Sequence, residues 1–443
     1  MKRVLFLDEN IFLVYLRKQI IHFKYKFLKS IFQYILLILK WLLICILVAI
    51  LAGASSSVFL FTLQWATDFR SDHLWLIFLL PIGGLLIGYL YHYYGNGVSK
   101  GNNVILEEYE NPYKTIPLKM APMVYIGTIL THFFGGSAGR EGTAVQMSTA
   151  IADQFTGVFK LAAQERKIIL IIGISGGFAS VFGTPLTGAV FALELLYFSR
   201  ISWKSIIPSF LTAYVAYYTV EFFQITHTHY PKPYIPELHL QIIPWILFVG
   251  ILCGLSARMF STGVHFFSVK AKEFVSFPPL RPFFGGLIFA VIIYFTGATQ
   301  YLGLGIPTIL ESFTVAQEGD VFLIKIIATA FILGTGFKGG EVTPLFFIGA
   351  ALGSALSIFV PLPVSLLAAM GFVAVFSGAT HTPLACTIMG IELFGIECGI
   401  YVGIACFVAY FFSGYLGIYE SQVVKGPKHV VYHFLTHRNL KNL

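Results

Sequence analysis

The chain has 443 residues, of which 57% are hydrophobic and only 11% are charged, and its mean hydropathy is +0.79. Soluble domains carry about 25% charged residues, so this composition excludes an ordinary soluble protein and indicates an integral membrane protein. Apolar runs approaching the roughly 20 residues of a helical span recur along the chain, whereas the alternating strands of an outer-membrane barrel are absent. We therefore predict an all-α polytopic membrane protein.

The two ends of the chain are basic. Residues 1–30 interleave Lys and Arg with Phe, Leu and Ile and offer no small-residue cleavage site, which favours a cytoplasmic amphipathic helix over a cleaved signal. Residues 425–443 form a short basic tail, so the positive-inside tendency predicts that both termini are cytoplasmic. The net charge of +8 then reflects contact of the basic segments with anionic lipid, and the sequence has no nucleic-acid motif. No soluble regulatory domain is expected.

Apolar segments fill the two halves that we assign to residues 31–236 and 237–424. The first half has long segments at 35–63, 75–94 and 117–134, and shorter ones at 168–182, 186–198 and 206–223. A polar break, GNGVSKGNN, covers residues 95–103, and residues 226–236 form a loop that we place outside the cell. The second half has segments at 242–261, 283–296, 321–334, 345–361, 364–376, 384–394 and 399–416. Short segments broken by Gly and Pro in both halves predict discontinuous helices that meet at a midplane site.

The halves resemble each other. TPLTGAVFALEL begins at Thr184 and TPLACTIMGIEL begins at Thr382, 198 residues later. The same shift places Arg140 on Lys338 and Gly142 on Gly340, which predicts an internal duplication. Similarity alone does not decide whether the copies are parallel or inverted.

The stretch GGSAGREGTAVQMSTAIADQF, residues 135–155, places Arg140 and Glu141 in an otherwise apolar region. Glycines and Thr143 precede an apolar run, as expected at the start of a helix. A helix start has unpaired N–H groups and a partial positive charge, so it attracts anions. Glu141 could occupy such a site and leave it when protonated, which is the chemistry of a gate. The simpler alternative is that Glu141 only interacts with the helix dipole near the surface.

The corresponding stretch of the second half is GTGFKGGEVTPLF, residues 334–346, with Lys338, Glu341 and Thr343 at another predicted helix start. Ionisable groups inside a membrane are costly and suggest function. Lys338 suits a counter-charge or a water-filled vestibule as well as ion binding. Glu341 could pass protons towards Glu141, and Thr343 could donate its hydroxyl to an anion beside neighbouring N–H groups.

Two further carboxylates occupy equivalent places in the repeat. Glu194 and Glu392 both precede Leu in the TPL segments. This equivalence favours a structural role, in which each carboxylate accepts hydrogen bonds from a neighbouring helix end, over proton transfer. Tyr419 follows the last apolar segment and suits either an interfacial anchor or an inward-pointing hydroxyl. The five cysteines lie in apolar segments without CxxC or Cys/His spacing, so neither disulfides nor zinc are expected.

The sequence Gly139-Arg140-Glu141-Gly142, after a glycine-rich approach, resembles the gating-glutamate motif of the CLC family of anion channels and anion/proton exchangers. The resemblance extends from about residue 35 to Tyr419. It implies a fold of two inverted-topology repeats with many tilted and broken helices, and homodimers in which each subunit has its own anion pathway. It also implies that Glu141 is the external gating glutamate and Tyr419 the central tyrosine.

Where the sequence departs from the chloride members, it resembles the bacterial fluoride-exporting branch of the family. In that branch GREGT, GGEVTP and GNN replace the corresponding chloride motifs. The serine that coordinates the anion in chloride members is replaced at Val98, or at Asn96 or Ser99 after a small shift in alignment. Val342 stands where chloride members have phenylalanine, and Thr143 follows the gating motif in place of proline. Leu195 follows Glu194, where chloride exchangers often have a second glutamate.

The resulting expectation is a fluoride/proton antiporter of the bacterial inner membrane, with no metal, cofactor or enzymatic activity. Fluoride holds its water tightly, so its dehydration requires several short, strong hydrogen bonds. The candidate anion ligands are Val98 or Asn96, the helix starts at Gly142 and Val342, Thr343 and Tyr419, with Glu141 and Glu341 as the acidic groups. A chloride/proton exchanger and a passive anion channel of the same fold are the alternatives.

Overall fold

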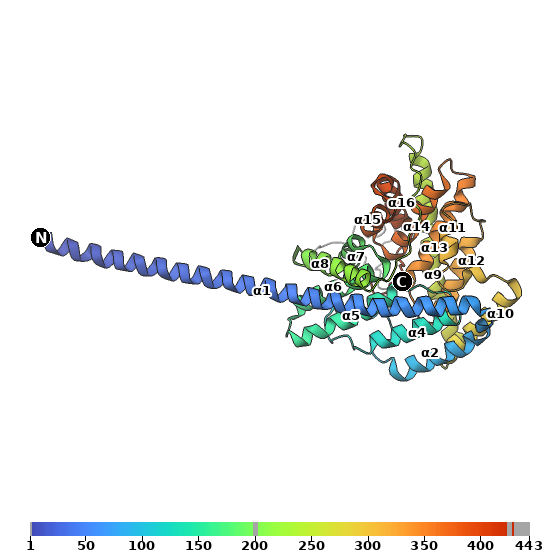
Figure 1. Ribbon diagram of the computed structural model, residues 1–443, viewed down its shortest axis with the longest axis horizontal. Helices are drawn as coiled ribbons and strands as arrows, with labels where there is room; N and C mark the ends of the chain where they lie inside the picture. Colours follow the sequence, from blue (N-terminus) through green and yellow to red (C-terminus); the bar gives the residue numbers. More distant parts are fainter. Residues whose placement is uncertain (1, 198–202, 423–427, 429–443) are drawn as a thin grey trace, which may run out of the picture. The chain divides into compact units, whose positions relative to one another are not determined.

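The protein is helical throughout in this computed structural model, which describes residues 2–197, 203–422 and 428 (Figure 1). The first half contains α1 (Lys2–Asp72), η1 (Leu74–Leu79), α2 (Leu80–Tyr94), α3 (Asn102–Glu110), α4 (Met120–Phe133), α5 (Glu141–Val158), α6 (Ala163–Phe182), α7 (Pro185–Tyr197) and α8 (Trp203–Phe222). The second half contains α9 (Ile243–Phe274), α10 (Leu280–Thr296), η2 (Thr299–Tyr301), α11 (Ile306–Glu311), α12 (Val321–Gly334), α13 (Val342–Ala355), η3 (Leu356–Ile358), α14 (Val364–Thr380), α15 (Pro383–Phe394), η4 (Ile396–Cys398) and α16 (Gly399–Phe412).

The chain divides into two compact units, residues 1–47 and 48–443. The first unit belongs to α1 and exposes apolar side chains such as Phe32, Ile35 and Leu39. Helix α1 continues past residue 30 without a break, so a separate amphipathic helix over residues 1–30 stays a prediction. The predicted basic tail lies outside the described residues except for Lys428.

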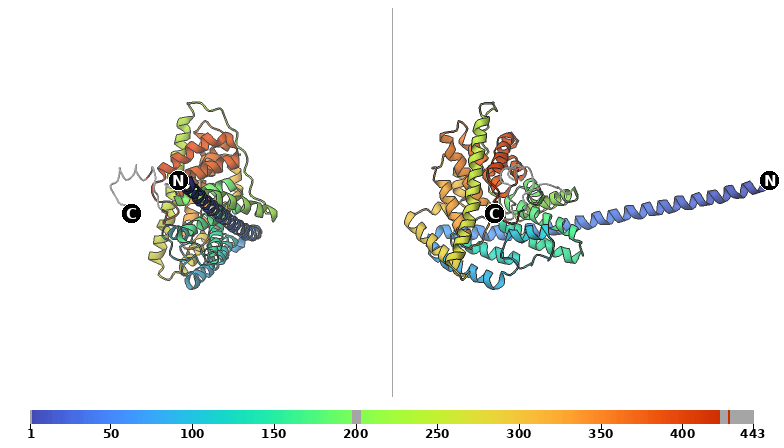
Figure 2. Two further views of the ribbon diagram at one scale, coloured as in Figure 1. Left: turned by 90° about the vertical axis from the view of Figure 1, so that its left-hand side faces the viewer. Right: turned by 180° about the vertical axis from the view of Figure 1, so that it is seen from behind.

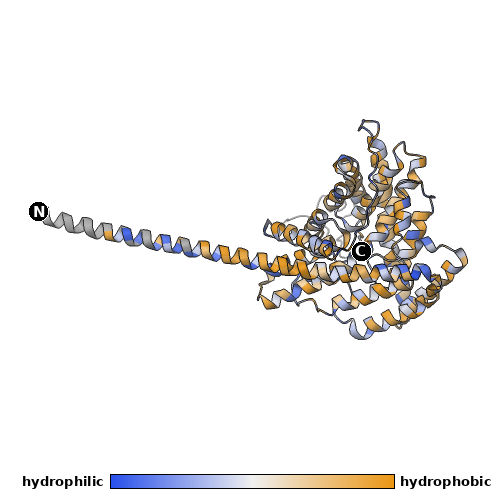
Figure 3. Ribbon diagram, in the orientation of Figure 1, coloured by the Kyte–Doolittle hydropathy of each residue, from blue (hydrophilic) through white to orange (hydrophobic). Residues whose placement is uncertain are grey.

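The second unit has the surface of a membrane protein. Large apolar side chains are exposed on its helices, for example Phe61, Ile292 and Phe295, and hydrophobic residues predominate along the ribbon (Figure 3). Among the residues that the structure describes, three stretches are long and apolar enough to cross a membrane: His22–Asp72, Leu74–Tyr94 and Ile243–Phe274. The other apolar helices in the described chain are mostly 10–17 residues long, in agreement with the predicted short and discontinuous helices.

Helices α4 to α7 recur as α12 to α15. The starts of α4, α5 and α6 (120, 141 and 163) recur 201 residues later (321, 342 and 364), but α7 and α15 start 198 residues apart, at 185 and 383. The single shift of 198 is therefore wrong for the first motif, whose Arg140 corresponds to Glu341 and not to Lys338. The physical reason is that α6 has 20 residues and α14 only 17.

The halves are joined by a reciprocal pair of helix caps. Glu194 of α7 accepts hydrogen bonds from Leu384 N (2.9 Å) and Ala385 N (2.7 Å) at the start of α15. Glu392 of α15 accepts them from Leu186 N (3.0 Å) and from Thr187 N (2.8 Å) at the start of α7. Each carboxylate satisfies orphan N–H groups of the other helix, as predicted for a structural role. Contacts exchanged in this way are those of two repeats related by a two-fold axis.

Removal of one cap should destabilise the protein measurably. Glu392→Ala leaves the N–H groups of Leu186 and Thr187 without their acceptor, and an unsatisfied buried donor costs about 1–3 kcal/mol. We expect a lower thermal unfolding temperature for the purified variant in detergent. Glu221 on α8 is exposed, so Glu221→Ala is the matched control and should unfold like the wild type. Equal unfolding temperatures for both variants would contradict the capping role.

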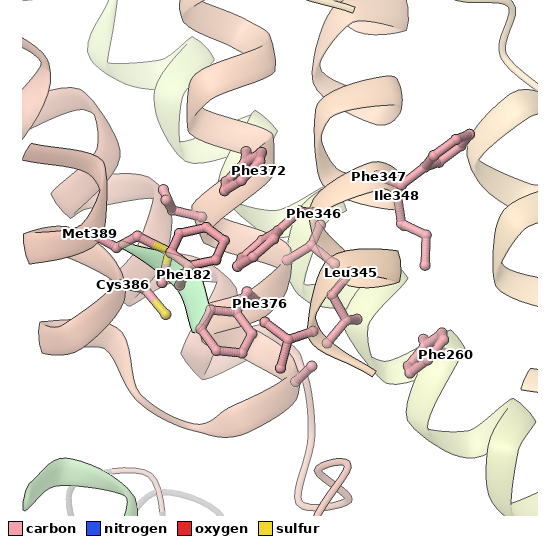
Figure 4. Packing of buried hydrophobic residues seen from close by; sticks show 14 of the residues in the cluster. Phe182, Phe260, Leu345, Phe346, Phe347, Ile348, Phe372, Phe376, Cys386 and Met389 are labelled. Atoms are coloured by element: carbon pink, nitrogen blue, oxygen red, sulfur yellow. The ribbon is translucent and has the colours of Figure 1, made fainter. Parts of the chain in front are cut away.

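The core beside the second motif is aromatic (Figure 4). Phe346 in α13 stacks on Phe372 in α14, with ring centroids 4.1 Å apart and planes 5° from parallel. Phe182 and Phe376 complete the contact, with centroids 5.0 and 5.2 Å from that of Phe346. Helix α9 packs along α12, α14 and α16 (Figure 2). The packing fixes the position of the first turns of α13, where the candidate site lies.

Candidate functional site

The two glycine-rich motifs meet at one antiparallel bridge. Gly139 N donates to Gly340 O (2.6 Å), and Gly340 N donates to Gly139 O (2.7 Å). Both positions require glycine, because a Cβ atom on Gly139 would lie 2.8 Å from Pro344 Cδ and one on Gly340 would lie 2.9 Å from Gly142 N. The bridge therefore brings the starts of α5 and α13 together from opposite halves of the chain.

Glu141 is the first residue of α5, and its buried side chain reaches the first turn of α13. Its Oε2 accepts a hydrogen bond from Thr343 N (3.1 Å), and the Thr343 hydroxyl lies 2.8 and 2.7 Å from Oε1 and Oε2. Since α13 begins at Val342, the carboxylate takes the place of an anion at the positive end of that helix. The carboxylate thus occupies helix-start donors that could otherwise bind an anion.

Neighbouring groups hold the Glu141 carboxylate in place. Arg140 Nε lies 3.6 Å from Glu141 Oε1, and Arg140 N donates to Oε2 (3.3 Å). Behind the first turn of α5, the Thr143 and Thr128 hydroxyls are 2.7 Å apart. The buried negative charge is therefore matched by an adjacent guanidinium and by helix-start donors, which such a charge requires.

The loop before α3 contains the residues predicted to replace the serine of chloride members. Val98 is buried and Asn96 is exposed, but the Val98 N–H donates to Gly95 O (3.0 Å) within a turn. The Val98 N–H is therefore engaged within the loop itself in this conformation. The physical reason is that the sequence GNGVS satisfies its own backbone through local turns. A role for Val98 or Asn96 in anion binding stays a prediction.

The other predicted residues gather around the helix starts. Gly142, Val342 and Thr343 are buried in the first turns of α5 and α13, and Glu341 is the half-buried residue that immediately precedes α13. Tyr419 is buried and lies within electrostatic range of both Glu341 and Glu141. The structure thus brings these residues together, while their individual roles stay predictions.

Three supporting residues were not selected from the sequence. Thr128 backs Thr143, His132 Nε2 lies 3.3 Å from Gly139 O, and Asn103 Oδ1 accepts a hydrogen bond from Ser421 N (3.0 Å). Asn103 lies in the GNN segment and connects it to the residues after Tyr419. The GNN motif could therefore have identified Asn103 from the sequence. Thr128 and His132 lie in an apolar helix with no motif to distinguish them.

The fold and site define a class: a polytopic membrane protein of two inverted repeats in which helix starts from both halves meet at one buried carboxylate. The chain belongs to the CLC family, because the family model described as "Voltage gated chloride channel" matches residues 83–414. A "Chloride/fluoride channel protein" of Pseudomonas syringae pv. tomato is 46% identical over 398 residues, covering 88% of this chain and 88% of the relative.

Two solved structures are also similar. A CLC-type fluoride/proton antiporter has a TM-score of 0.85 and 34% identity, covering 88% of this chain and 98% of the other. A slow cyanobacterial Cl⁻/H⁺ antiporter has a TM-score of 0.75 and 18% identity, covering 91% of this chain and 99% of the other, which shows the shared fold alone.

Proposed function

We propose that the protein is a fluoride/proton antiporter that exports fluoride across the bacterial inner membrane, with Glu141 as its gate. The observation that carries the proposal is the pairing of the Glu141 carboxylate with the N–H and hydroxyl of Thr343 at the start of α13. An anion bound there needs the same donors, so carboxylate and anion exclude each other. Protonation of Glu141 removes its charge and favours exchange for the anion, which couples the two ions.

Fluoride is favoured over chloride by the chemistry of the donors. The Thr343 hydroxyl and the helix-start N–H groups converge within hydrogen-bond distance of single carboxylate oxygens. Such short bonds best replace the tightly held water of the smallest halide. The 34% identical fluoride/proton antiporter and the relative named for chloride and fluoride support the same choice.

The protein acts as a homodimer in this proposal, with both termini in the cytoplasm and its basic segments against anionic lipid. Each subunit contains its own gate, since Glu141 and Thr343 belong to the same chain. Glu341, beside the start of α13 and near Tyr419, passes protons towards Glu141.

A proton gradient alone should drive fluoride uphill through the purified protein in liposomes. If one fluoride leaves as one proton enters, two charges move down an inside-negative potential, worth about 4.6 kcal/mol at roughly 100 mV. This supports a fluoride ratio of roughly a thousandfold, against about fiftyfold for a channel that moves one charge. A fluoride electrode and a pH indicator follow both ions.

The alternatives give different results in the same vesicles. Passive fluoride flux without uphill movement would identify an anion channel, in keeping with the name of the Pseudomonas relative. Proton-driven chloride movement with little fluoride transport would identify a chloride/proton exchanger. Either outcome would refute the antiporter proposal.

A further inference from the structure

The Tyr419 segment, residues 413–422, follows α16 and forms no helix of its own. Tyr419 is 7% exposed and lies within electrostatic range of Glu341 and Glu141. Because the segment has no helical hydrogen-bond ladder, its backbone groups need partners on neighbouring elements. The position of the Tyr419 side chain therefore depends on what the segment contacts.

One set of contacts comes from the end of α14, in the second half of the chain. Ile418 N donates to the carbonyl of Ala379 (2.9 Å), and Gln422 Nε2 donates to that of Thr380 (2.9 Å). The last carbonyls of a helix have no partner within the helix, so both bonds satisfy groups that α14 leaves free. These bonds hold the segment on both sides of Tyr419.

A second set of contacts comes from α3, in the first half of the chain. Asn103 Oδ1 accepts a hydrogen bond from Ser421 N (3.0 Å), and Glu107 Oε1 accepts one from the Ser421 hydroxyl (3.0 Å). Asn103 and Glu107 are four residues apart and therefore lie on one face of α3. Glu107 is exposed, whereas Asn103 is half-buried and bonds the main chain two residues after Tyr419. Asn103 therefore makes the firmer of the two contacts.

The start of α3 also lies against the first turn of α5. A Cβ atom on Gly142 would lie 3.1 Å from Nδ2 of Asn102, the residue before Asn103. Gly142 directly follows Glu141, so α3 packs next to the helix turn that carries the carboxylate. Asn103 thus connects the Tyr419 segment to the element that contacts the start of α5.

We propose that Asn103 is a positioning residue that fixes the spacing between Tyr419 and the start of α5, and thereby sets the preference for fluoride over chloride. The inference rests on the proposed function, because it takes the Tyr419 hydroxyl as a ligand of the transported anion. Fluoride needs short, strong hydrogen bonds, so it depends on a hydroxyl held at close range. Chloride is larger and tolerates a displaced donor. Asn103 itself needs no contact with the ion.

The test measures the dissociation constants of fluoride and chloride for the purified full chain by isothermal titration calorimetry. Asn103→Leu keeps the approximate shape but leaves Ser421 N without its acceptor. We expect the ratio of the chloride constant to the fluoride constant to fall about two- to tenfold, as for the loss of one ordinary hydrogen bond. Asn111→Leu is the matched control, because Asn111 is exposed at the other end of α3 and should keep the wild-type ratio.

Two other changes at Asn103 separate positioning from general damage. Asn103→Asp retains an acceptor for Ser421 N, and its added charge repels both halides, so the ratio should stay at the wild-type value. Asn103→Ala removes the acceptor and should lower the ratio as Asn103→Leu does, so it answers the same question if the leucine variant does not fold. A loss of stability alone would weaken both halides and leave the ratio unchanged.

The decisive measurement repeats Asn103→Leu in a Tyr419→Phe background. A residue that acts through the Tyr419 hydroxyl has no further effect once that hydroxyl is gone, so the double variant should have the ratio of Tyr419→Phe alone. Additive changes would overturn the proposal. A wild-type ratio in both Asn103→Leu and Asn103→Ala would do the same, as would an equal fall in Asn111→Leu or Asn103→Asp. The ratio does not depend on proton coupling, so a failed proton-drive experiment leaves this inference separately decidable.

Discussion

Glu141→Gln is expected to abolish proton-coupled exchange. In the wild type both carboxylate oxygens lie within hydrogen-bond distance of the Thr343 hydroxyl, and one also accepts the Thr343 N–H. An amide keeps the shape but cannot gain or lose a proton, and its NH₂ group cannot accept from these donors. Proton movement driven by fluoride should fall to the background of protein-free liposomes, with fluoride flux either blocked or uncoupled.

Two further variants test whether the effect is specific to Glu141. Glu221→Gln on α8 changes an exposed carboxylate and should exchange fluoride for protons at the normal ratio. Glu341→Gln should slow coupled flux without changing the ratio, because it removes a proton relay but leaves the gate. If Glu141→Gln exchanged the two ions at the normal ratio, the gate assignment would be wrong. An unaffected rate in Glu341→Gln would leave Glu341 with a structural role.

Thr343→Val should weaken fluoride binding much more than chloride binding. The substitution preserves shape and the backbone N–H, but it removes the hydroxyl that lies 2.7 Å from Glu141 Oε2. Loss of one hydrogen bond to a charged group costs roughly 1.5–3 kcal/mol, or about ten- to a hundredfold in binding. The loss of binding should be larger for fluoride than for chloride, because fluoride depends most on short hydrogen bonds. Competition between the two halides for transport in liposomes measures the change.

Thr343→Ser retains the hydroxyl and is the matched control, so it should keep the fluoride preference. Full discrimination in Thr343→Val would remove the hydroxyl from the selectivity mechanism. Equal fluxes of fluoride and chloride through the wild type would assign the chain to the chloride members of the family.

Local patterns predicted those features of the site that depend on local structure. Glycines and Thr143 before an apolar run predicted a helix entry there, and α5 begins two residues before Thr143, at Glu141. Equivalence in the repeat predicted the structural role of Glu194 and Glu392. Both follow from the chemistry of helix ends. The reciprocal bonding partners themselves were beyond reach, because they lie about 200 residues away in the chain.

Features that depend on tertiary register could not be predicted. Nothing in the motifs shows that α14 is shorter than α6, so Arg140 was matched with Lys338 in place of Glu341. The Val98 N–H could donate either to a ligand or to a carbonyl of its own turn, and the folded backbone shows that it donates to Gly95 O.

The reciprocal caps and the contact between Glu141 and Thr343 have a consequence for biosynthesis. Glu141 and Glu194 are made with the first half of the chain, but their donors at Thr343, Leu384 and Ala385 are made with the second. Until α13 and α15 have entered the membrane, both carboxylates lack these partners in a medium where a lone charge is costly. The first half thus cannot complete its polar bonding as it leaves the ribosome. Its final packing must wait for the second half, so the two repeats fold as one cooperative unit although each looks self-contained in sequence.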